Sequence, residues 1–459
     1  MLKELKIMNK LFTRKNMTVL ILFGIIGQIA WAVENMYFNL FIFETIEPNL
    51  DAITLMVQAS GIVATVATLI AGTISDKLGN RRSFISYGYI IWGVTVALFG
   101  FLSPELFESV FRTDYKTAVT VALYVTVGAD CVMTMFGSFA NDAAFNAWVT
   151  DNTSKENRGR IESIIAILPL VAMLIVAGGF GILAEALGYT LLFLILGIVI
   201  TLCGVAGIFI IKDKKGLSPS GRLSDIFYGF KPSTVKNNTP FYVSLIIMCV
   251  YGIACQIFMP YLIIYMKSYL SFSVIEYSVV FGLAIVLGAV INLFLGKLSD
   301  KFDKRRSMYL AAGIFAIGLF FMYLAKDLGK IPTLIIFGIC GFVMITGYIY
   351  ISALCGAITR DYTPEADTGK LQGIRMIFCV LIPMLIGPTI GNAINKAMNI
   401  PLTDAGADAM TTSFIPAPEI FLAAAIAALL ILALIPLLQR VSAGKEKPHS
   451  TIDEGSAQG

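Results

Sequence analysis

Long apolar runs, separated by short polar segments, occupy most of the chain. A helix needs ~20 apolar residues to cross a bilayer, because each residue adds only ~1.5 Å along the axis. Twelve runs come close to this length or exceed it, at 17–44, 53–75, 83–103, 117–149, 161–186, 189–211, 241–267, 276–299, 307–325, 332–359, 372–397 and 416–439. Every backbone polar group must be paired inside lipid, which leaves helices for segments this long. The pattern therefore predicts an all-α membrane protein with twelve transmembrane helices.

The composition agrees with this pattern and excludes several kinds of site. Hydrophobic residues make up 57% of the 459 residues and charged residues only 14%, whereas soluble domains carry about 25% charged residues. The only histidine, His449, lies in a polar tail, which excludes a metal site built from several histidines. We expect no cofactor and no bound metal.

The basic residues predict how the helices are oriented. Lysine and arginine accumulate on the cytoplasmic side of membrane proteins. With a cytoplasmic N-terminus, all but six of the 34 basic residues fall on that side. The six exceptions lie at the outer ends of runs: Arg112, Lys116, Lys267, Lys326, Lys330 and Lys396. We therefore expect a multi-pass protein of the cell (plasma) membrane with both termini cytoplasmic. The net charge of +4 is explained by topology, and no nucleic-acid partner is expected.

One polar loop between apolar runs occurs twice. Residues 72–83 read Gly-Thr-Ile-Ser-Asp-Lys-Leu-Gly-Asn-Arg-Arg-Ser, and residues 296–307 read Gly-Lys-Leu-Ser-Asp-Lys-Phe-Asp-Lys-Arg-Arg-Ser. Seven positions are identical, while Asp303 replaces the counterpart of Gly79 in the second copy. The chain is therefore expected to consist of two copies of one design.

This duplicated loop resembles the signature between helices 2 and 3 of the major facilitator superfamily, a Gly, an Asp four residues later and paired basic residues. The resemblance implies two pseudo-symmetric six-helix halves at 1–211 and 241–440, joined by a cytoplasmic linker at 212–240 and followed by a disordered cytoplasmic tail at 441–459. It also implies that the loops hold the halves together on the cytoplasmic side in one state. The residues that carry this conformational role are Gly72, Asp76, Arg81, Arg82, Gly296, Asp300, Arg305 and Arg306. The simpler alternative is that these charges only anchor the topology.

Three carboxylates fall inside apolar runs of the first half. Glu34 lies in the first run, and Asp130 and Asp142 lie in the fourth. An ionisable side chain near the bilayer centre costs at least ~2.5 kcal/mol, so such groups usually face a cavity or mark an ion pathway. We interpret them as candidate cation-coupling groups. The alternatives are a packing role for Glu34 and a helix-capping role for Asp142.

Helical geometry predicts how the polar residues of helices 1 and 4 are arranged. Spacings of seven and four residues place Gln28, Asn35 and Asn39 on one face of helix 1. In an ideal helix Asp142 lies about 120° around the axis from Asp130 and ~18 Å further along. The two aspartates should therefore not form a site by themselves.

Two segments narrow the resemblance to one branch of the superfamily. Residues 141–160, which begin Asn-Asp-Ala-Ala-Phe-Asn-Ala-Trp, and residues 36–44, Met-Tyr-Phe-Asn-Leu-Phe-Ile-Phe-Glu, look like the glycoside–pentoside–hexuronide:cation symporters and the related sucrose-transporter-like proteins. The resemblance implies a sugar as solute and a coupling cation. Sodium-coupled members carry acids in the middle of helix 2, and this chain has none there, which favours a proton over sodium.

Sugar recognition requires amide hydrogen bonds and an aromatic face. The candidate substrate-binding residues are Asn35, Asn39, Asn141, Trp148 and Gln256. The second half lacks a clear mid-membrane carboxylate or base, which fits ion coupling in the first half and solute binding shared by both.

The favoured hypothesis is cation-coupled uptake of a glycoside or oligosaccharide by alternating access, in a lipid bilayer, with a small-molecule solute and a cation as partners. A proton-driven exporter of amphipathic compounds is the main alternative. A membrane sensor that binds a sugar without moving it is a third class. An enzyme is least expected, because no nucleophile–base pair, metal cluster or large extramembrane domain is evident.

Overall fold

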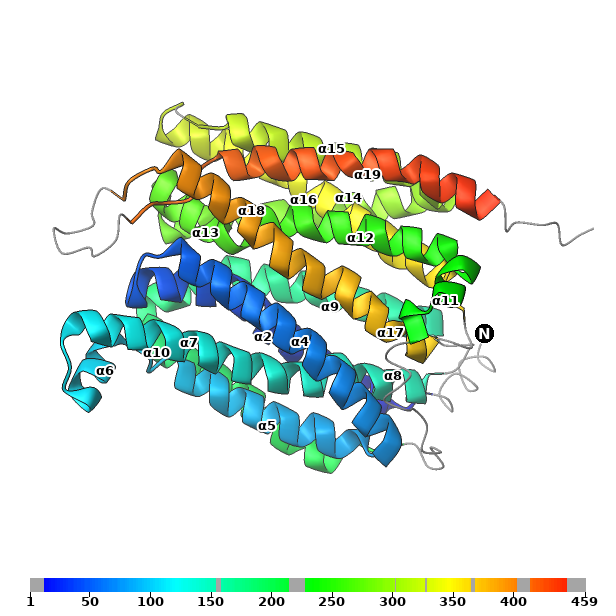
Figure 1. The fold of residues 1–459 in the computed structure, drawn as a ribbon, viewed down its shortest axis with the longest axis horizontal. Coiled ribbons are helices and arrows are strands. Elements are labelled where there is room, and N and C mark those ends of the chain that lie inside the picture. The colour runs from blue at the N-terminus through cyan, green and yellow to red at the C-terminus, as the bar shows by residue number, and fades with distance from the viewer. Residues whose placement is uncertain are drawn as a thin grey trace, which may run out of the picture.

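The part of the chain that the structure describes is an all-helical bundle with twelve membrane crossings (Figure 1). The computed structural model describes residues 12–153, 158–213, 228–301, 303–326, 328–364, 368–402 and 413–443. Eleven helical stretches within this part are long and apolar enough to span a membrane. The stretch 164–210 contains two crossings, because Gly188 breaks the helical path with φ 75° and ψ 160°. The predicted fold is thus confirmed.

The N-terminal half supplies helices 1 to 6. Their elements are α2 (Arg14–Val33), η1 (Glu34–Phe38), α3 (Asn39–Phe41) and η2 (Ile42–Ile46) in helix 1; α4 (Leu50–Leu78) in helix 2; α5 (Arg81–Phe99) in helix 3; α7 (Tyr115–Gly137), η3 (Ser138–Phe145) and α8 (Asn146–Asn152) in helix 4; and α9 (Arg158–Ile175), η4 (Val176–Phe180) and α10 (Gly181–Ile210) in helices 5 and 6. A short helix, α6 (Pro104–Phe111), lies between helices 3 and 4.

The C-terminal half supplies helices 7 to 12. Their elements are α12 (Thr239–Phe258), η6 (Met259–Tyr261), α13 (Leu262–Ile264) and η7 (Tyr265–Tyr269) in helix 7; α14 (Val274–Lys301) in helix 8; α15 (Lys304–Leu324) in helix 9; α16 (Lys330–Asp361) in helix 10; α17 (Thr368–Met376), η9 (Ile377–Leu381) and α18 (Ile382–Met398) in helix 11; and α19 (Glu419–Ala443) in helix 12. A short helix, α11 (Pro232–Asn237), precedes helix 7.

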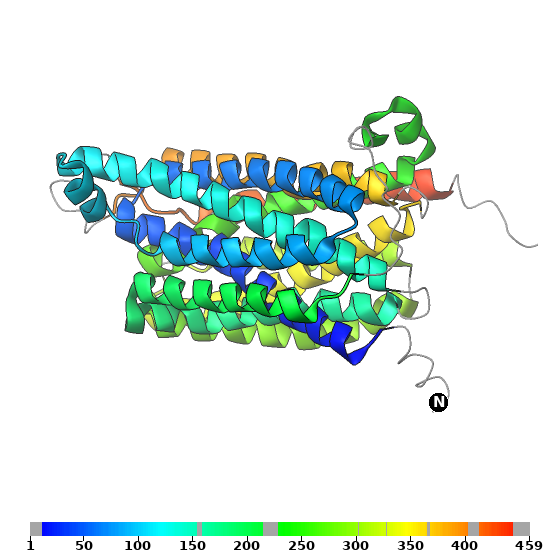
Figure 2. The same ribbon diagram turned by 90° about the horizontal axis from the view of Figure 1, so that it is seen from below.

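The two ends of the bundle differ in the elements that lie there (Figures 1 and 2). We call the end that carries α6 the Glu44 end, and the end that carries α8, α11 and α17 the Arg81 end. Large apolar side chains such as Phe209, Leu293 and Ile331 are exposed along the bundle between them. A continuous apolar surface of this kind suits contact with lipid rather than with water.

Local capping explains where the repeated loops begin and end. Gly79 ends α4 in the left-handed conformation, with φ 62°, a position that favours glycine. In the second copy Asp303 has φ −59°, and its side chain accepts a hydrogen bond from the backbone N–H of Arg305. The two loops therefore differ in capping: Gly79 is the C-cap of the preceding helix, whereas Asp303 is the N-cap of the following one.

Helices 1 and 4 contain π-helical turns. Glu34–Phe38 and Ile42–Ile46 form such turns in helix 1, and Ser138–Phe145 forms a longer one in helix 4. A π-turn adds a residue to the turn and rotates the next part of the helix about its axis, and such turns occur often at functional sites. Each of the two helices that carry the predicted carboxylates is thus wound differently from an ideal helix.

Candidate functional site

The three predicted carboxylates lie on three neighbouring elements of the N-terminal half. Glu34 begins the π-turn η1, Asp130 lies on α7, and Asp142 lies within the π-turn η3. Glu34 is 6% exposed, Asp130 is 1% exposed, and Asp142 is half-buried. The charges of both aspartates act on Glu34. Both aspartates therefore lie within electrostatic reach of Glu34.

Glu34 and Asp130 are each held by one hydroxyl. Thr134 Oγ1 donates a 2.9 Å hydrogen bond to Glu34 Oε1, and Ser60 Oγ donates to Asp130 Oδ2. The second oxygen of each carboxylate, Glu34 Oε2 and Asp130 Oδ1, is buried without a hydrogen-bond partner among the described residues. An open acceptor on a buried carboxylate is the place where a proton can be held.

Asp142 belongs to a separate hydrogen-bonded chain. Ser138 Oγ donates to its Oδ2 at 3.1 Å, and the Asn141 side-chain amide lies 3.4 Å from its Oδ1. Tyr89 Oη in turn donates to Asn141 Oδ1 at 3.0 Å and lies 2.7 Å from the carbonyl oxygen of Phe23. The chain of contacts joins helices 1, 3 and 4 around Asp142.

Helix 1 can approach this chain closely because it carries a glycine there. A Cβ at Gly27 would lie 2.6 Å from both Asn141 Oδ1 and Tyr89 Oη. Real Cβ atoms do not come this close to other heavy atoms, so a larger residue would push helix 1 away from the site.

In the part of the chain that the structure describes, no basic side chain forms an ion pair with the three acids. Among the described residues, every hydrogen bond that the three carboxylates accept comes from a hydroxyl or an amide. Burying a carboxylate without a counter-charge costs several kcal/mol, so a bound cation or proton is the least unfavourable way to keep such a group buried. The arrangement therefore places buried acids without a paired base, among the described residues, between helices 1, 2 and 4.

Two of the predicted substrate-binding residues are committed to other roles. Trp148 is 0% exposed, it packs against Phe12 and Phe145, and its Nε1 donates to the carbonyl oxygen of Lys212 at 3.0 Å. Its ring is therefore covered in this conformation, and a role for Trp148 in solute binding stays a prediction. Asn141 is 3% exposed and belongs to the Asp142 chain.

The remaining substrate candidates differ in how accessible they are. Asn35 is exposed, and its amide donates to the carbonyl oxygen of Trp31 at 2.7 Å. Asn39 is 1% exposed and donates to the carbonyl oxygen of Asn35, while its own Oδ1 is buried without a partner among the described residues. Gln256 on helix 7 is half-buried.

The two copies of the repeated loop pair with matching positions at the Arg81 end. In the first half Arg81 Nε lies 3.1 Å from Asp151, at the end of helix 4. In the second half Lys304 Nζ lies 2.6 Å from Asp361, at the end of helix 10. Each pair therefore joins the start of the third helix to the end of the fourth helix in its own half.

The other residues predicted to hold the halves together at this end make different kinds of contact. Arg82 donates to the carbonyl oxygen of Ile208, and Arg305 lies 2.8 Å from Asp303. The backbone of Arg306 bonds to Asp303, whereas the side chains of Asp76 and Asp300 lie outside the described ones. A Cβ at Gly72 or at Gly296 would meet nothing within 4 Å, so no described element packs closely on either glycine in this conformation.

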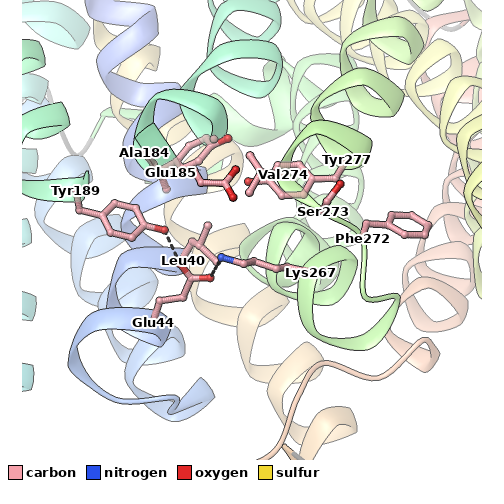
Figure 3. Close-up of a pocket in the computed structure, with 12 residues that line it drawn as sticks. Leu40, Glu44, Ala184, Glu185, Tyr189, Lys267, Phe272, Ser273, Val274 and Tyr277 are labelled. Carbon is pink, nitrogen blue, oxygen red and sulfur yellow. Dashed lines mark hydrogen bonds and ion pairs between the residues drawn. The ribbon is translucent and has the colours of Figure 1, made fainter. Parts of the chain in front are cut away.

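At the Glu44 end, by contrast, polar contacts join the two halves. Glu44 of helix 1 pairs with Lys267 of helix 7 and accepts a 2.8 Å hydrogen bond from Tyr189 (Figure 3). Asp51 of helix 2 lies 2.6 Å from Lys396 of helix 11. These residues close the bundle at the Glu44 end, beside a cavity of about 220 Å³ that Glu44 and Lys267 help to line.

Buried contacts continue this closure toward the middle of the bundle. Thr54 on helix 2 is hydrogen-bonded to Tyr261 on helix 7 over 2.7 Å. Gln58 donates to the Leu385 carbonyl oxygen at 3.0 Å and to Thr389 Oγ1 at 2.7 Å, both on helix 11. These contacts run from Glu44 and Lys267 inward to Gln58 and Thr389, so the two halves are closed against each other at the Glu44 end.

Sequence reasoning did not identify the residues that close the Glu44 end. Glu44 and Lys267 occupy the outer ends of helices 1 and 7, at nearly the offset that relates Gly72 to Gly296. An acid and a base at matching positions of an internal repeat were a usable signal for a contact between halves. Ser60 carried no such signal, because a serine in an apolar helix is common.

The fold and these sites define a membrane transporter built from two six-helix halves rather than an enzyme. A model of the Major Facilitator Superfamily matches residues 19–388, and a second match covers 245–457. The chain therefore belongs to the Major Facilitator Superfamily. A search of curated proteins returns no match.

Solved structures with this fold cover nearly the whole chain. A mutant of the nucleoside transporter NupG aligns with a TM-score of 0.67 at 10% identity, over 92% of this chain and 98% of that chain. An inward-facing, unoccupied bacterial homologue of the human lysosomal transporter Spinster gives 0.66 at 13% identity, over 95% and 100%. An outward-facing bacterial homologue of the iron transporter ferroportin with soaked iron gives 0.61 at 13% identity, over 92% and 98%. At these identities the likeness shows the fold.

Proposed function

We propose that this protein is a proton-coupled transporter of a hydroxylated solute, a glycoside or oligosaccharide, which works by alternating access in the cell membrane. The Arg81 end faces the cytoplasm in this proposal, as the distribution of lysine and arginine favours. The conformation closed at the Glu44 end is then the inward-facing one.

One observation carries the proposal of cation coupling. Glu34, Asp130 and Asp142 are gathered between helices 1, 2 and 4 without a basic partner among the described residues, and Glu34 and Asp130 each keep one open buried oxygen. Helix 2 contributes the hydroxyl of Ser60 to this group rather than a carboxylate. A proton needs one open oxygen, whereas a sodium ion needs several oxygen ligands, so the proton is favoured.

A nucleoside is the second candidate solute. NupG, a nucleoside transporter, shares the fold over most of both chains. A nucleoside is chemically an N-glycoside, so amides that bind a sugar ring could also bind its ribose. Asn35, Asn39 and Gln256 suit either solute.

The test is a panel of labelled solutes in proteoliposomes. The panel contains disaccharides, simple glycosides, nucleosides and an amphipathic cation, and each is measured with an imposed pH gradient and then with a sodium gradient. We expect one hydroxylated solute to accumulate with an inward proton gradient and to stop when a protonophore is added. Accumulation with sodium alone would overturn the choice of ion, and transport of the amphipathic cation alone would favour the exporter.

A further inference from the structure

Helix 2 touches both the carboxylate group and the opposite half within one helical turn. On one face Ser60 Oγ donates to Asp130 Oδ2, and these residues are 3% and 1% exposed. Two positions away, Gln58 donates to the Leu385 carbonyl oxygen and to Thr389 Oγ1 of helix 11. The residue after Ser60, Gly61, packs so closely that a Cβ there would lie 2.7 Å from Met384 Cβ.

These contacts cannot change independently. Residues 58 to 61 span only about 4.5 Å along α4, less than one turn, so they move as a rigid unit. The Ser60 bond fixes the rotation of α4 about its own axis, and that rotation presents Gln58 and Gly61 to α18. Figure 1 shows α4 and α18 side by side along the boundary between the halves, and the polar contacts of Gln58 confirm this.

The strength of the Ser60 contact depends on the charge of Asp130. A hydroxyl bonds about twice as strongly to an ionised carboxylate as to a neutral acceptor. The titratable groups around Asp130 are Glu34 from η1, its neighbour Cys131 on α7 and, beyond Glu34, Asp142 on η3. Among the described residues, no lysine, arginine or histidine is paired with Asp130.

We propose that the hydrogen bond between Ser60 and Asp130 is the positioning contact through which proton loss closes the two halves at the Glu44 end. The inference rests on the proposed function, because it requires Asp130 to gain and lose a proton during transport. Ionised Asp130 holds Ser60 firmly and keeps α4 against α18. Protonated Asp130 holds it weakly and lets α4 turn away.

The coupling between ionisation of Asp130 and closure also gives the order of steps that inward proton transport requires. Linkage is reciprocal: if ionisation of Asp130 favours closure at the Glu44 end, then closure favours release of the proton. A proton bound while the Glu44 end is open would thus be released after that end closes. Ser60 is therefore a positioning residue for coupling and does not carry the proton itself.

The experiment measures how closure depends on pH. Spin labels at Glu108→Cys and Ile275→Cys, both exposed at the Glu44 end, report the closed and open populations by their separation. The measured quantity is the closed-to-open ratio at pH 8 divided by that at pH 5. In Ser60→Ala this quotient should fall by about fivefold, the difference between a charged and a neutral hydrogen bond.

Three matched variants make the test specific. Ser60→Thr keeps a hydroxyl and should restore the quotient. Thr65→Ala removes a buried hydroxyl of the same helix that bonds to the Gly61 carbonyl oxygen of its own turn, and it should behave as the unmodified chain. Gln58→Leu should lower the closed population at both pH values while leaving the quotient unchanged.

The outcomes separate this inference from the proposed function. If Asp130→Asn abolishes gradient-driven accumulation but Ser60→Ala keeps the full quotient, the role of Ser60 is wrong and proton coupling stands. If Asp130→Asn, Glu34→Gln and Asp142→Asn all accumulate solute normally, the proposed coupling itself fails. If Ser60→Ala does not fold, the spin-label measurement on Asp130→Asn decides instead: a side chain that cannot ionise at position 130 should bring the quotient close to one, and a full quotient would overturn the role of the contact between Ser60 and Asp130.

Discussion

The hydroxyl of Thr134 on helix 4 donates a 2.9 Å hydrogen bond to Oε1 of Glu34 on helix 1. Both residues are almost fully buried, and the other oxygen of Glu34 has no partner among the described residues. The bond holds one oxygen of the carboxylate in place and leaves the other available. A side chain held in this way can exchange a proton without losing its position.

The first prediction concerns the three carboxylates. A coupling acid must be alternately protonated and ionised, so Asp142→Asn, Asp130→Asn and Glu34→Gln should each reduce gradient-driven accumulation by at least about tenfold. Exchange of solute down its own gradient requires no net proton movement and should survive. Asp142 ranks first, because it alone lies in the helix 4 segment that resembles the symporters.

The control for these variants is an acid of the same half outside the membrane-spanning part. Asp114 is exposed and caps α7 by accepting a hydrogen bond from the Thr117 N–H. Asparagine caps a helix about as well as aspartate, so Asp114→Asn should change neither mode of transport. If the three buried variants also accumulate solute against a gradient, the carboxylates are structural.

The second prediction concerns the close approach of helix 1. In Gly27→Ala the new methyl group would lie 2.6 Å from Asn141 Oδ1 and from Tyr89 Oη, and the Tyr89 hydroxyl is held between Asn141 Oδ1 and the Phe23 carbonyl oxygen. Overpacking of this kind costs ~1–3 kcal/mol, so the melting temperature of the purified protein should fall. Gly128→Ala on α7, where a Cβ meets nothing within 4 Å, should leave it unchanged or raise it. Equal melting temperatures would show that helix 1 does not press on Asn141.

Much of the fold and part of the site could be predicted from the sequence, for identifiable physical reasons. Lipid allows only helices for long apolar runs, so twelve crossings could be counted from hydropathy alone. Buried acids are costly in a membrane, so Glu34, Asp130 and Asp142 stood out by their position. The repeated loops were visible because residue types recur at fixed offsets.

The detailed arrangement of the site depends on local winding and tertiary packing, which the spacing of residue types along the sequence does not encode. The π-turns at Glu34–Phe38 and Ser138–Phe145 change the winding of the helices that carry the acids, so ideal angles could not show that both Asp130 and Asp142 would lie within electrostatic reach of Glu34. Trp148 looked suitable for a sugar, yet tertiary packing surrounds it with Phe12 and Phe145. Contacts between the halves depend on how the helices of the two halves pack, which hydropathy does not encode.

The third prediction concerns orientation. Cysteines at Thr153 and Lys236, both at the Arg81 end, should be labelled by an impermeant reagent only from the cytoplasmic side. A cysteine at Glu108 should be labelled only from outside, because α6 lies at the opposite end. Asn49, in the loop between helices 1 and 2, is a less suitable site for this probe. Its side chain caps α4 by accepting hydrogen bonds from two backbone N–H groups. Labelling of Glu108→Cys from inside and of Thr153→Cys from outside would reverse the orientation.

The last prediction concerns Gly181, where helix 5 meets helix 8 of the other half. A Cβ at this position would lie 2.5 Å from Tyr277 Oη and 2.9 Å from Val274 Cγ1, and both residues belong to α14. The backbone of Gly181 is helical, so Gly181→Ala adds no backbone strain and acts only through this steric contact. The closed-to-open ratio at the Glu44 end should therefore fall by at least about fivefold, as expected for ~1 kcal/mol of overpacking. The spin-label pair at Glu108→Cys and Ile275→Cys measures that ratio.

The matched control is Gly179→Ala, two residues away. A Cβ there has nothing within 4 Å, so this variant should leave the closed-to-open ratio unchanged. If both variants stay closed to the same extent as the unmodified chain, the contact between Gly181 and Tyr277 does not limit closure, and the halves must meet elsewhere.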